Sequence, residues 1–231
     1  MTTQAQVKKL VKPLLERHSD LALVGHLIVV KPLRHVLRAI IIDRTSNAAY
    51  FRPAWFVDHL LEDHHAFHIT WGSRVYGAKR VNWTFSNAGV GDDLLEAAER
   101  GLLPILRAIS NLESLYTIAA AGAGGCPPFG EGAGAVVMSI ALGNLDAARR
   151  LVPSVRERFS IGSPVEISRV NPHFVFDTPS YFDWFNRLCR LLDQDDRDGM
   201  ARMLHDWEAA TIGNLKMKHL WEPTPFPLEV H

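Results

Sequence analysis

The order of apolar and polar positions predicts one helix, then a group of strands, and then further helices. The opening segment places apolar residues three and four positions apart with lysines on the other face, as in an amphipathic helix. Its apolar positions are Val7, Leu10, Val11, Leu14 and Leu15. Pro13 lies within this pattern, so we expect the helix to begin late or to kink there.

Several short segments after this helix have the composition of β-strands. Residues 21–30 and 36–43 are rich in β-branched side chains and predict two paired strands. Residues 48–51 and 67–71 are further strand candidates, whereas residues 55–61 fit either a helix or a strand. We therefore expect a small antiparallel sheet in the first half of the chain.

The next part of the chain predicts a loop followed by a helix. Glycine and asparagine recur over residues 72–91, which is typical of a loop, with a short strand at 81–85. Asp92–Asp93 precede apolar residues at helical spacing, and acidic residues favour the positive end of a helix dipole. Pro104 is expected to divide this helix into two parts, the second ending near Leu112.

Residues 119–135, AAAGAGGCPPFGEGAGA, show the clearest change of composition in the chain. Their closely spaced glycines and prolines predict a linker or loop. We expect it to separate an α+β domain (1–118) from a helical region (136–231), and the sequence leaves open whether the two halves pack as one unit.

The helical region reads as two α-hairpins. Residues 136–142 and 145–158 form the first predicted pair, and residues 181–192 and 199–215 form the second. A solenoid repeat is the alternative, but such arrays need at least three units to bury a continuous core. The predicted fold class is therefore α+β: an N-terminal helix and a small antiparallel sheet, followed by a helical half of two α-hairpins.

The last residues of the chain are spaced by prolines and predict an extended segment. Trp221 and Phe226 are the large apolar side chains in it, and we expect them to hold the segment against the body of the protein.

Composition limits the function classes. Lys plus Arg and Asp plus Glu both number 25, so no net basic field draws in nucleic acid, and general nucleic-acid binding is not expected. The apolar runs are too short to cross a membrane. The two cysteines, Cys126 and Cys189, form no metal or disulfide pattern. We expect a soluble, cytoplasmic protein and leave its oligomeric state open.

A histidine-rich segment, HLLEDHHAFH, is the sharpest candidate for chemistry. If it is helical, His64 and His68 lie on one face, and His59 and His65 are close in sequence, so a divalent metal could bind. The HExxH pattern is absent. A metal-dependent, hydrolase-like enzyme is accordingly one hypothesis, and a solvated turn is the alternative interpretation.

The glycine-rich stretch offers a weaker hypothesis, a nucleotide-binding loop, because closely spaced glycines let backbone N–H groups approach an anion. No Walker or GxGxxG pattern accompanies it. No cofactor is predicted from it.

Tryptophans beside cations indicate an interaction surface. Trp71 and Trp83 stand near Arg74 and Arg80 in sequence, and we expect the two rings to be partly exposed. Tryptophan and arginine are enriched where proteins meet. Our leading hypothesis is a non-enzymatic binding or accessory protein whose partner is another protein.

Overall fold

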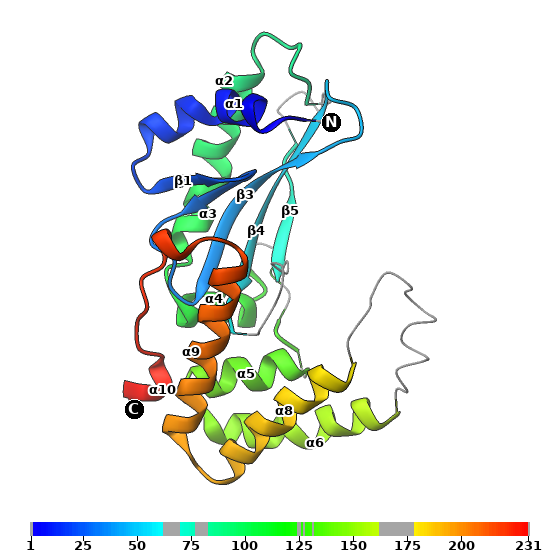
Figure 1. Ribbon diagram of the computed structural model, residues 1–231, viewed down its shortest axis with the longest axis vertical. Helices are drawn as coiled ribbons and strands as arrows, with labels where there is room; N and C mark the ends of the chain where they lie inside the picture. Colours follow the sequence, from blue (N-terminus) through cyan, green and yellow to red (C-terminus); the bar gives the residue numbers. More distant parts are fainter. Residues whose placement is uncertain are drawn as a thin grey trace. The chain divides into compact units, whose positions relative to one another are not determined.

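The computed structural model describes residues 2–61, 70–76, 83–123, 126, 128–130, 132–161 and 178–230. The chain, drawn in Figure 1, divides into two compact units. The first unit comprises residues 1–127 and 209–224, and the second comprises residues 128–208 and 225–231. Strands and helices are both present, so the α+β class is confirmed.

Helix α1 (Gln4–Arg17) opens the first unit. Thr3 and Gln6 form a reciprocal capping box at its start, which satisfies two backbone donors that the helix cannot pair internally. The helix begins well before Pro13 and continues past it. It packs against helix α2 and strand β1, through its buried face.

Five antiparallel strands form one sheet in the order β1-β2-β3-β4-β5. They span Leu21–Val24, Leu27–Val30, Val36–Arg44, Phe51–His59 and Trp71–Arg74. The expected single strand at 21–30 was wrong, because Gly25 adopts a positive φ of 61° and turns the chain into a hairpin. Residues 55–59, ambiguous from their pattern, belong to β4. The expected strand at 67–71 falls partly outside the described residues.

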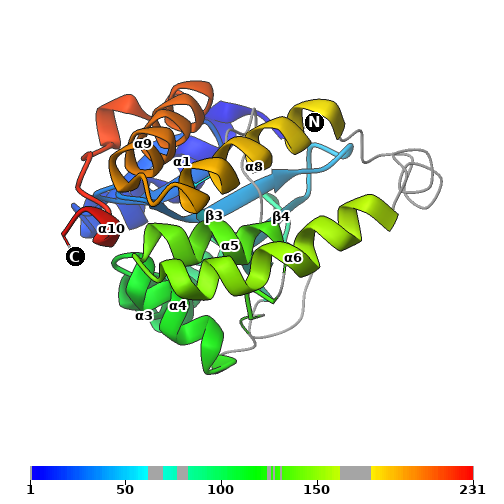
Figure 2. The same cartoon turned by 90° about the horizontal axis from the view of Figure 1, so that it is seen from below.

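One face of the sheet is covered by the segment that ends helix α9 and follows it. The cluster that forms there joins strand residues Val29, Leu37 and Phe56 with Ile212 and Met217. Every one of these side chains is almost fully buried. In Figure 2 the C-terminal turns of α9 and helix α3 lie on opposite sides of the strands. Helices therefore flank both faces of the central strands.

A nearly continuous helical run follows the loop at 83–89. It consists of α2 (Val90–Ala97), a π-helical stretch (Ala98–Leu102) and α3 (Leu103–Ala108). Pro104 sits in the first turn of α3, at the junction with the π-helical stretch, where a change of hydrogen-bond register accommodates a residue without an N–H. The expected end near Leu112 was wrong, because a separate helix α4 (Leu112–Ala120) begins there, capped by the Asn111 side chain.

The second unit contains the predicted α-hairpins. Helices α5 (Ala133–Ala141) and α6 (Leu145–Ile161) form the first, with Gly143 at a φ of 76° between them. Helices α8 (Thr178–Asp193) and α9 (Arg197–Asn214) form the second, although residues 209–214 of α9 belong to the first unit. Among the described residues, no helix is long and apolar enough to cross a membrane.

The chain ends with a 3-10 turn (Lys218–Leu220), an extended segment and helix α10 (Pro227–Val230). In the first unit, Leu33 N–H donates to Leu220 O and Glu222 N–H donates to Leu33 O. In the second unit, Phe226 is fully buried, with its ring 4.6 Å from that of His205. Each unit thus holds part of the terminal segment. The proposed linker at 119–135 and the boundary at 118 stay predictions.

Candidate functional site

A cavity of about 420 Å³ opens at the end of the sheet where β4 begins, in the first unit. We call it the strand-end pocket. Its described lining comes from three segments that are distant in sequence: residues 45–53, residues 74–76 and Trp83. Hydroxyl and amide groups, four aromatic rings and two arginines line it, and no described carboxylate does so.

The loop between β3 and β4 forms one wall and is held by its own hydrogen bonds. Thr45 Oγ1 donates to Asn47 O at 2.5 Å and lies 2.9 Å from Tyr50 O. Asn47 Oδ1 accepts from Ala49 N–H at 2.9 Å. Thr2 Oγ1, just before α1, also donates to Tyr50 O, at 3.0 Å. These contacts link the loop to itself and to the residues just before α1.

Trp83 forms part of the pocket wall and is fixed at three points. Its indole Nε1–H donates to Val75 O at 2.9 Å, and its carbonyl accepts from Phe51 N–H at 3.1 Å. Its ring lies 5.8 Å from the Phe51 ring, centroid to centroid. Trp83 therefore connects the start of β4 with the residue that follows β5 on this side of the pocket.

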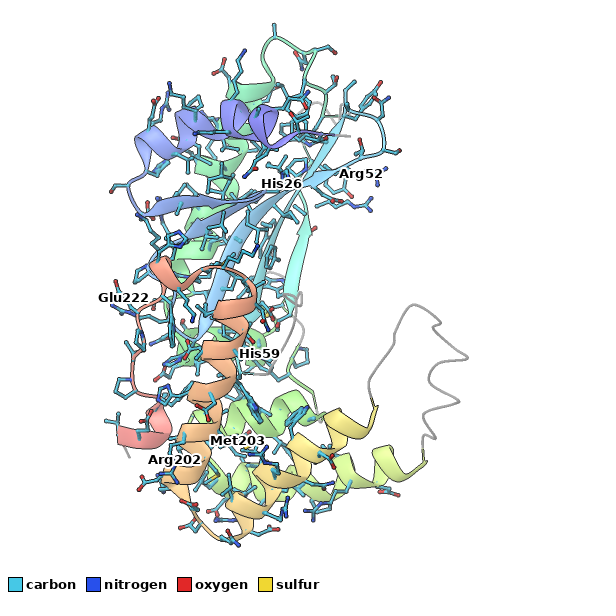
Figure 3. The ribbon with its side chains drawn as sticks, in the orientation of Figure 1. His26, Arg52, His59, Arg202, Met203 and Glu222 are labelled. Carbon is cyan, nitrogen blue, oxygen red and sulfur yellow. The ribbon has the colours of Figure 1, made fainter. Side chains whose placement is uncertain are left out.

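Arg52 and Arg74 supply positive charge. In the β4–β5 register Arg74 lies opposite Ala54, two residues from Arg52, so both arginines are on the same face of the sheet as diagonal neighbours. Both are exposed, and neither forms an ion pair with any residue that the structure describes. Asp43 lies opposite Arg52 in the β3–β4 register but is not within ion-pair distance. Figure 3 shows Arg52 and His59 at opposite ends of β4.

The predicted interaction residues separate in the structure. Arg74 and Trp83 both line the strand-end pocket. Trp71, expected to be partly exposed, is only 7% exposed, because its ring packs edge-on against Trp55 at 4.8 Å. Arg80 lies outside the described residues. The use of these residues in partner binding stays a prediction.

Arg52, Tyr50 and Tyr76 are among the pocket residues that the sequence did not identify. Arg52 lies between buried Phe51 and buried Pro53 in β4. The alternation of apolar and charged residues over 51–53 has the period of two of a strand, and it could have placed Arg52 on an exposed face. Tyr50 is 40% exposed at the preceding turn, and nothing in its local sequence distinguishes it from a structural tyrosine. Only the return of the chain at residue 83 brings these residues together with Trp83.

The opposite end of β4 carries a buried carboxylate and a histidine in place of exposed arginines. Asp58 is 1% exposed and accepts a hydrogen bond from Thr70 Oγ1 at 2.9 Å. His59 ends the strand there, while the other predicted metal ligands, His64, His65 and His68, lie outside the described residues. Within the described part of the chain, no three His, Cys, Asp or Glu residues come together as a metal site. The metal site stays a prediction.

The cysteines and the glycine-rich stretch add no chemistry to the described part of the chain. Burial raises the pKa of the Cys126 and Cys189 thiols, which favours the unreactive protonated form. Residues 124, 125, 127 and 131 of the glycine-rich stretch are outside the described residues. The nucleotide-binding hypothesis stays a prediction.

A second group of charged residues lies where α1 ends, and we call it the charge cluster: Arg17, His18, Asp20, Glu99 and Arg107. Arg107 donates to both Asp20 oxygens at 2.8 Å and lies 3.2 Å from His18 Nδ1. His18 Nε2 lies 3.0 Å from Glu99 Oε1. Neutral His18 protonated on Nε2 satisfies both contacts, since Nδ1 then accepts from Arg107.

These contacts lower the pKa values of the two carboxyl groups in the charge cluster. The hydrogen bonds from Arg107 lower the pKa of Asp20, against a smaller opposing effect of burial. The hydrogen bond with His18 and the charge of Arg17 lower the pKa of Glu99. The charges of this cluster therefore satisfy one another.

Comparisons with protein-family models, with curated proteins and with solved structures found no match to this chain.

Proposed function

We propose that this chain is a non-enzymatic binding protein that recognises an acidic segment of another protein through the strand-end pocket. The observation that carries the proposal is the pair of exposed arginines, Arg52 and Arg74, that have no ion-pair partner among the described residues. A guanidinium group matches a carboxylate with two parallel hydrogen bonds. A partner carboxylate would supply the anion that the described lining of the pocket lacks.

The aromatic lining supports a protein partner. Tyrosine, tryptophan and arginine contribute much of the binding energy at protein interfaces. The two aromatic side chains are large and rigid, so they lose little entropy on binding. Tyr50, Tyr76 and Trp83 provide such rings around the two arginines. The hydrogen bonds of Trp83 and of the 45–50 loop support a pocket that needs no rearrangement to bind.

The charge balance favours a protein over a nucleic acid. Arginines and aromatic rings also suit single-stranded nucleic acid, which binds through phosphates and base stacking. Such binding, however, depends on a broad basic surface, and the formal net charge of this chain is zero. A local cationic pocket fits one or two carboxylates better.

We place the protein in the cytoplasm. Cys126 and Cys189 are both buried and neither forms a disulfide, which is compatible with a reducing compartment. This placement is tested by localising the tagged full-length chain in its native cell, where secretion would contradict it.

A displayed library of random peptides, selected against the full chain at about 0.15 M salt, tests the proposed function. We expect enrichment of Asp and Glu in the selected peptides. The double variant R52E/R74E should lose the affinity for those peptides, by roughly 50-fold or more, because it turns two attractions into repulsions. The matched control is R202E, an exposed arginine of α9 in the second unit, labelled in Figure 3, and it should bind normally.

Three outcomes would contradict the proposal. Selected peptides without acidic enrichment would do so, and so would equal loss of affinity in R202E and R52E/R74E. Binding of a single-stranded oligonucleotide more tightly than any selected peptide would point to nucleic acid instead. Urea unfolding of each variant shows whether the loss of binding comes from loss of folding.

A further inference from the structure

A second cavity, of about 460 Å³, adjoins the strand-end pocket within the first unit. The two cavities share three lining residues, Arg74, Val75 and Tyr76. The other described lining of the second cavity comes from α2 and the π-helical stretch, so we call it the helix-side pocket. Because one short segment borders both cavities, a single extended ligand that crosses this segment would reach both.

The chemistry of the helix-side pocket differs from that of the strand-end pocket. Val75, Ala97 and Leu102 give it an apolar wall. Of its charged groups, Arg100 pairs with Glu96 at 2.6 Å on the same helical face, whereas Asp93 and Arg74 form no ion pair with any described residue. Asp93, Glu96 and Arg100 are exposed, so an apolar side chain can pack against the apolar wall while these charged groups stay in water.

Tyr76 stands on the border between the two cavities and is 72% exposed. A tyrosine ring so exposed gains burial only when a ligand covers it, and it presents an apolar face with a polar tip. An extended peptide that runs from one pocket to the other would cover it. Tyr76 is therefore well placed to contact the backbone between the two anchoring side chains.

We infer that the two pockets bind one peptide segment, with an acidic residue at Arg52 and Arg74 and an apolar residue in the helix-side pocket. This inference rests on the proposed function and specifies its ligand: an acidic residue and an aliphatic or aromatic residue separated by a short spacer. The acidic anchor provides steering and orientation, and the apolar anchor provides most of the added affinity.

Gly101 offers a way to test the helix-side pocket alone. It lines that pocket, is exposed, and has open space where a Cβ would stand. G101L should fill the pocket without a clash, and leucine is a better helix former than glycine. Gly91, in α2, also has open space at its Cβ position and lies outside the described lining of both pockets. G91L is therefore the matched control.

The experiment measures the affinity of synthetic peptides for the full chain by fluorescence anisotropy. One peptide carries Glu-Glu in a Gly-Ser background, and a series adds one Leu at one to five residues from it. We expect the acidic peptide to bind and the best member of the series to bind about tenfold more tightly, as burial of one leucine side chain predicts. G101L should abolish that gain while keeping the affinity for the acidic peptide, and G91L should change neither.

The outcomes separate the inference from the proposed function. No binding of any acidic peptide would overturn both. Binding of the acidic peptide with no gain from Leu at any spacing would overturn the inference alone. A gain that survives in G101L would show that leucine binds elsewhere and would also overturn the inference. Unchanged urea unfolding of G101L confirms that the filled pocket leaves the fold intact.

Discussion

Two groups of charged residues in the first unit use arginine in opposite ways. In the charge cluster, Arg107 is fully engaged, with two bonds to Asp20 and one contact to His18. In the strand-end pocket, Arg52 and Arg74 form no ion pair with any carboxylate that the structure describes. The first group joins α1 to the helical run at 90–108, and the second faces the solvent.

The difference shows how a chain with zero net charge can still present a local charged binding site. Charges that satisfy one another add to the stability of the folded chain, whereas an arginine left unpaired beside aromatic rings is available to a ligand. Replacing a paired arginine should therefore change stability, and replacing an unpaired one should change binding.

The largest expected effect on stability comes from a substitution that displaces β5. This strand carries Arg74 of the strand-end pocket and contributes no residue to the charge cluster. A Cβ at Gly72 would collide with the Trp55 carbonyl oxygen and with Phe56. G72A should lower the free energy of unfolding by about 2 kcal/mol, since rigid backbone must move. Urea unfolding measures the loss, and peptide binding should weaken with it.

G91A is the control for this substitution, because a Cβ at Gly91 meets nothing within 4 Å. It should leave stability unchanged or raise it slightly, as alanine favours the helix. If G72A proved as stable as G91A, the close approach of Gly72 to the β4 backbone would not contribute to stability.

The paired arginine should matter next most for stability. R107Q removes the two bonds to Asp20 and the contact to His18, and should lower the free energy of unfolding by about 1 kcal/mol. R52Q, which breaks no described ion pair, should change it by less than about 0.5 kcal/mol. Equal losses in the two variants, measured by urea unfolding, would refute the division between paired and unpaired charges.

Acid should weaken the charge cluster specifically. The Arg107 hydrogen bonds lower the pKa of folded Asp20, so the unfolded chain takes up its proton first as the pH falls. Asp20 therefore contributes fully to stability at pH values above the ordinary pKa of a carboxyl group. This contribution is lost as the pH falls below that value toward the lowered pKa of folded Asp20. In D20N the free energy of unfolding should fall less between about pH 6 and about pH 3 than in the wild type.

The exposed Asp206 of α9, which has no described ion pair, provides the control for this titration. D206N should retain the acid dependence of the wild type. An acid dependence that is the same in D20N and in the wild type would show that Asp20 contributes nothing to it.

The smallest expected effect tests the surroundings of Arg52. Asp43 lies opposite Arg52 in the strand register without forming an ion pair, so it reduces the positive potential near the pocket. D43N should tighten the binding of an acidic peptide about twofold, and the gain should shrink at high salt. Fluorescence anisotropy at two salt concentrations measures this. Weaker binding in D43N would show that Asp43 supports the site instead of opposing it.

Local pattern predicted most of the elements but misplaced several of their ends. The helical spacing of Val7, Leu10 and Leu14 correctly predicted α1, and Gly143 correctly marked the turn between α5 and α6. The hairpin at Gly25 was missed, because apolar residues continue on both sides of the turn. The start of α4 was missed because Asn111, its capping residue, follows α3 too closely to suggest a separate helix.

The candidate site could be predicted only in part. Arg74 and Trp83 drew attention because cations and tryptophans were close in sequence, and both line the strand-end pocket. Trp71 has the same neighbours, but Trp55 on the adjacent strand covers its ring. Whether a tryptophan is exposed depends on what packs against it, and sequence proximity to arginine carries no such information.

The sequence by itself determined the α+β class, the N-terminal helix and the paired helices of the second half, because periodicity and capping act within a few residues. Only the tertiary structure decided that residues 45–53, 74–76 and 83 form one pocket. Strand register and the return of the chain bring these segments together, and both depend on contacts between residues far apart in sequence. The same long-range packing left Arg52 and Arg74 unpaired among the described residues while it paired Arg107 with Asp20.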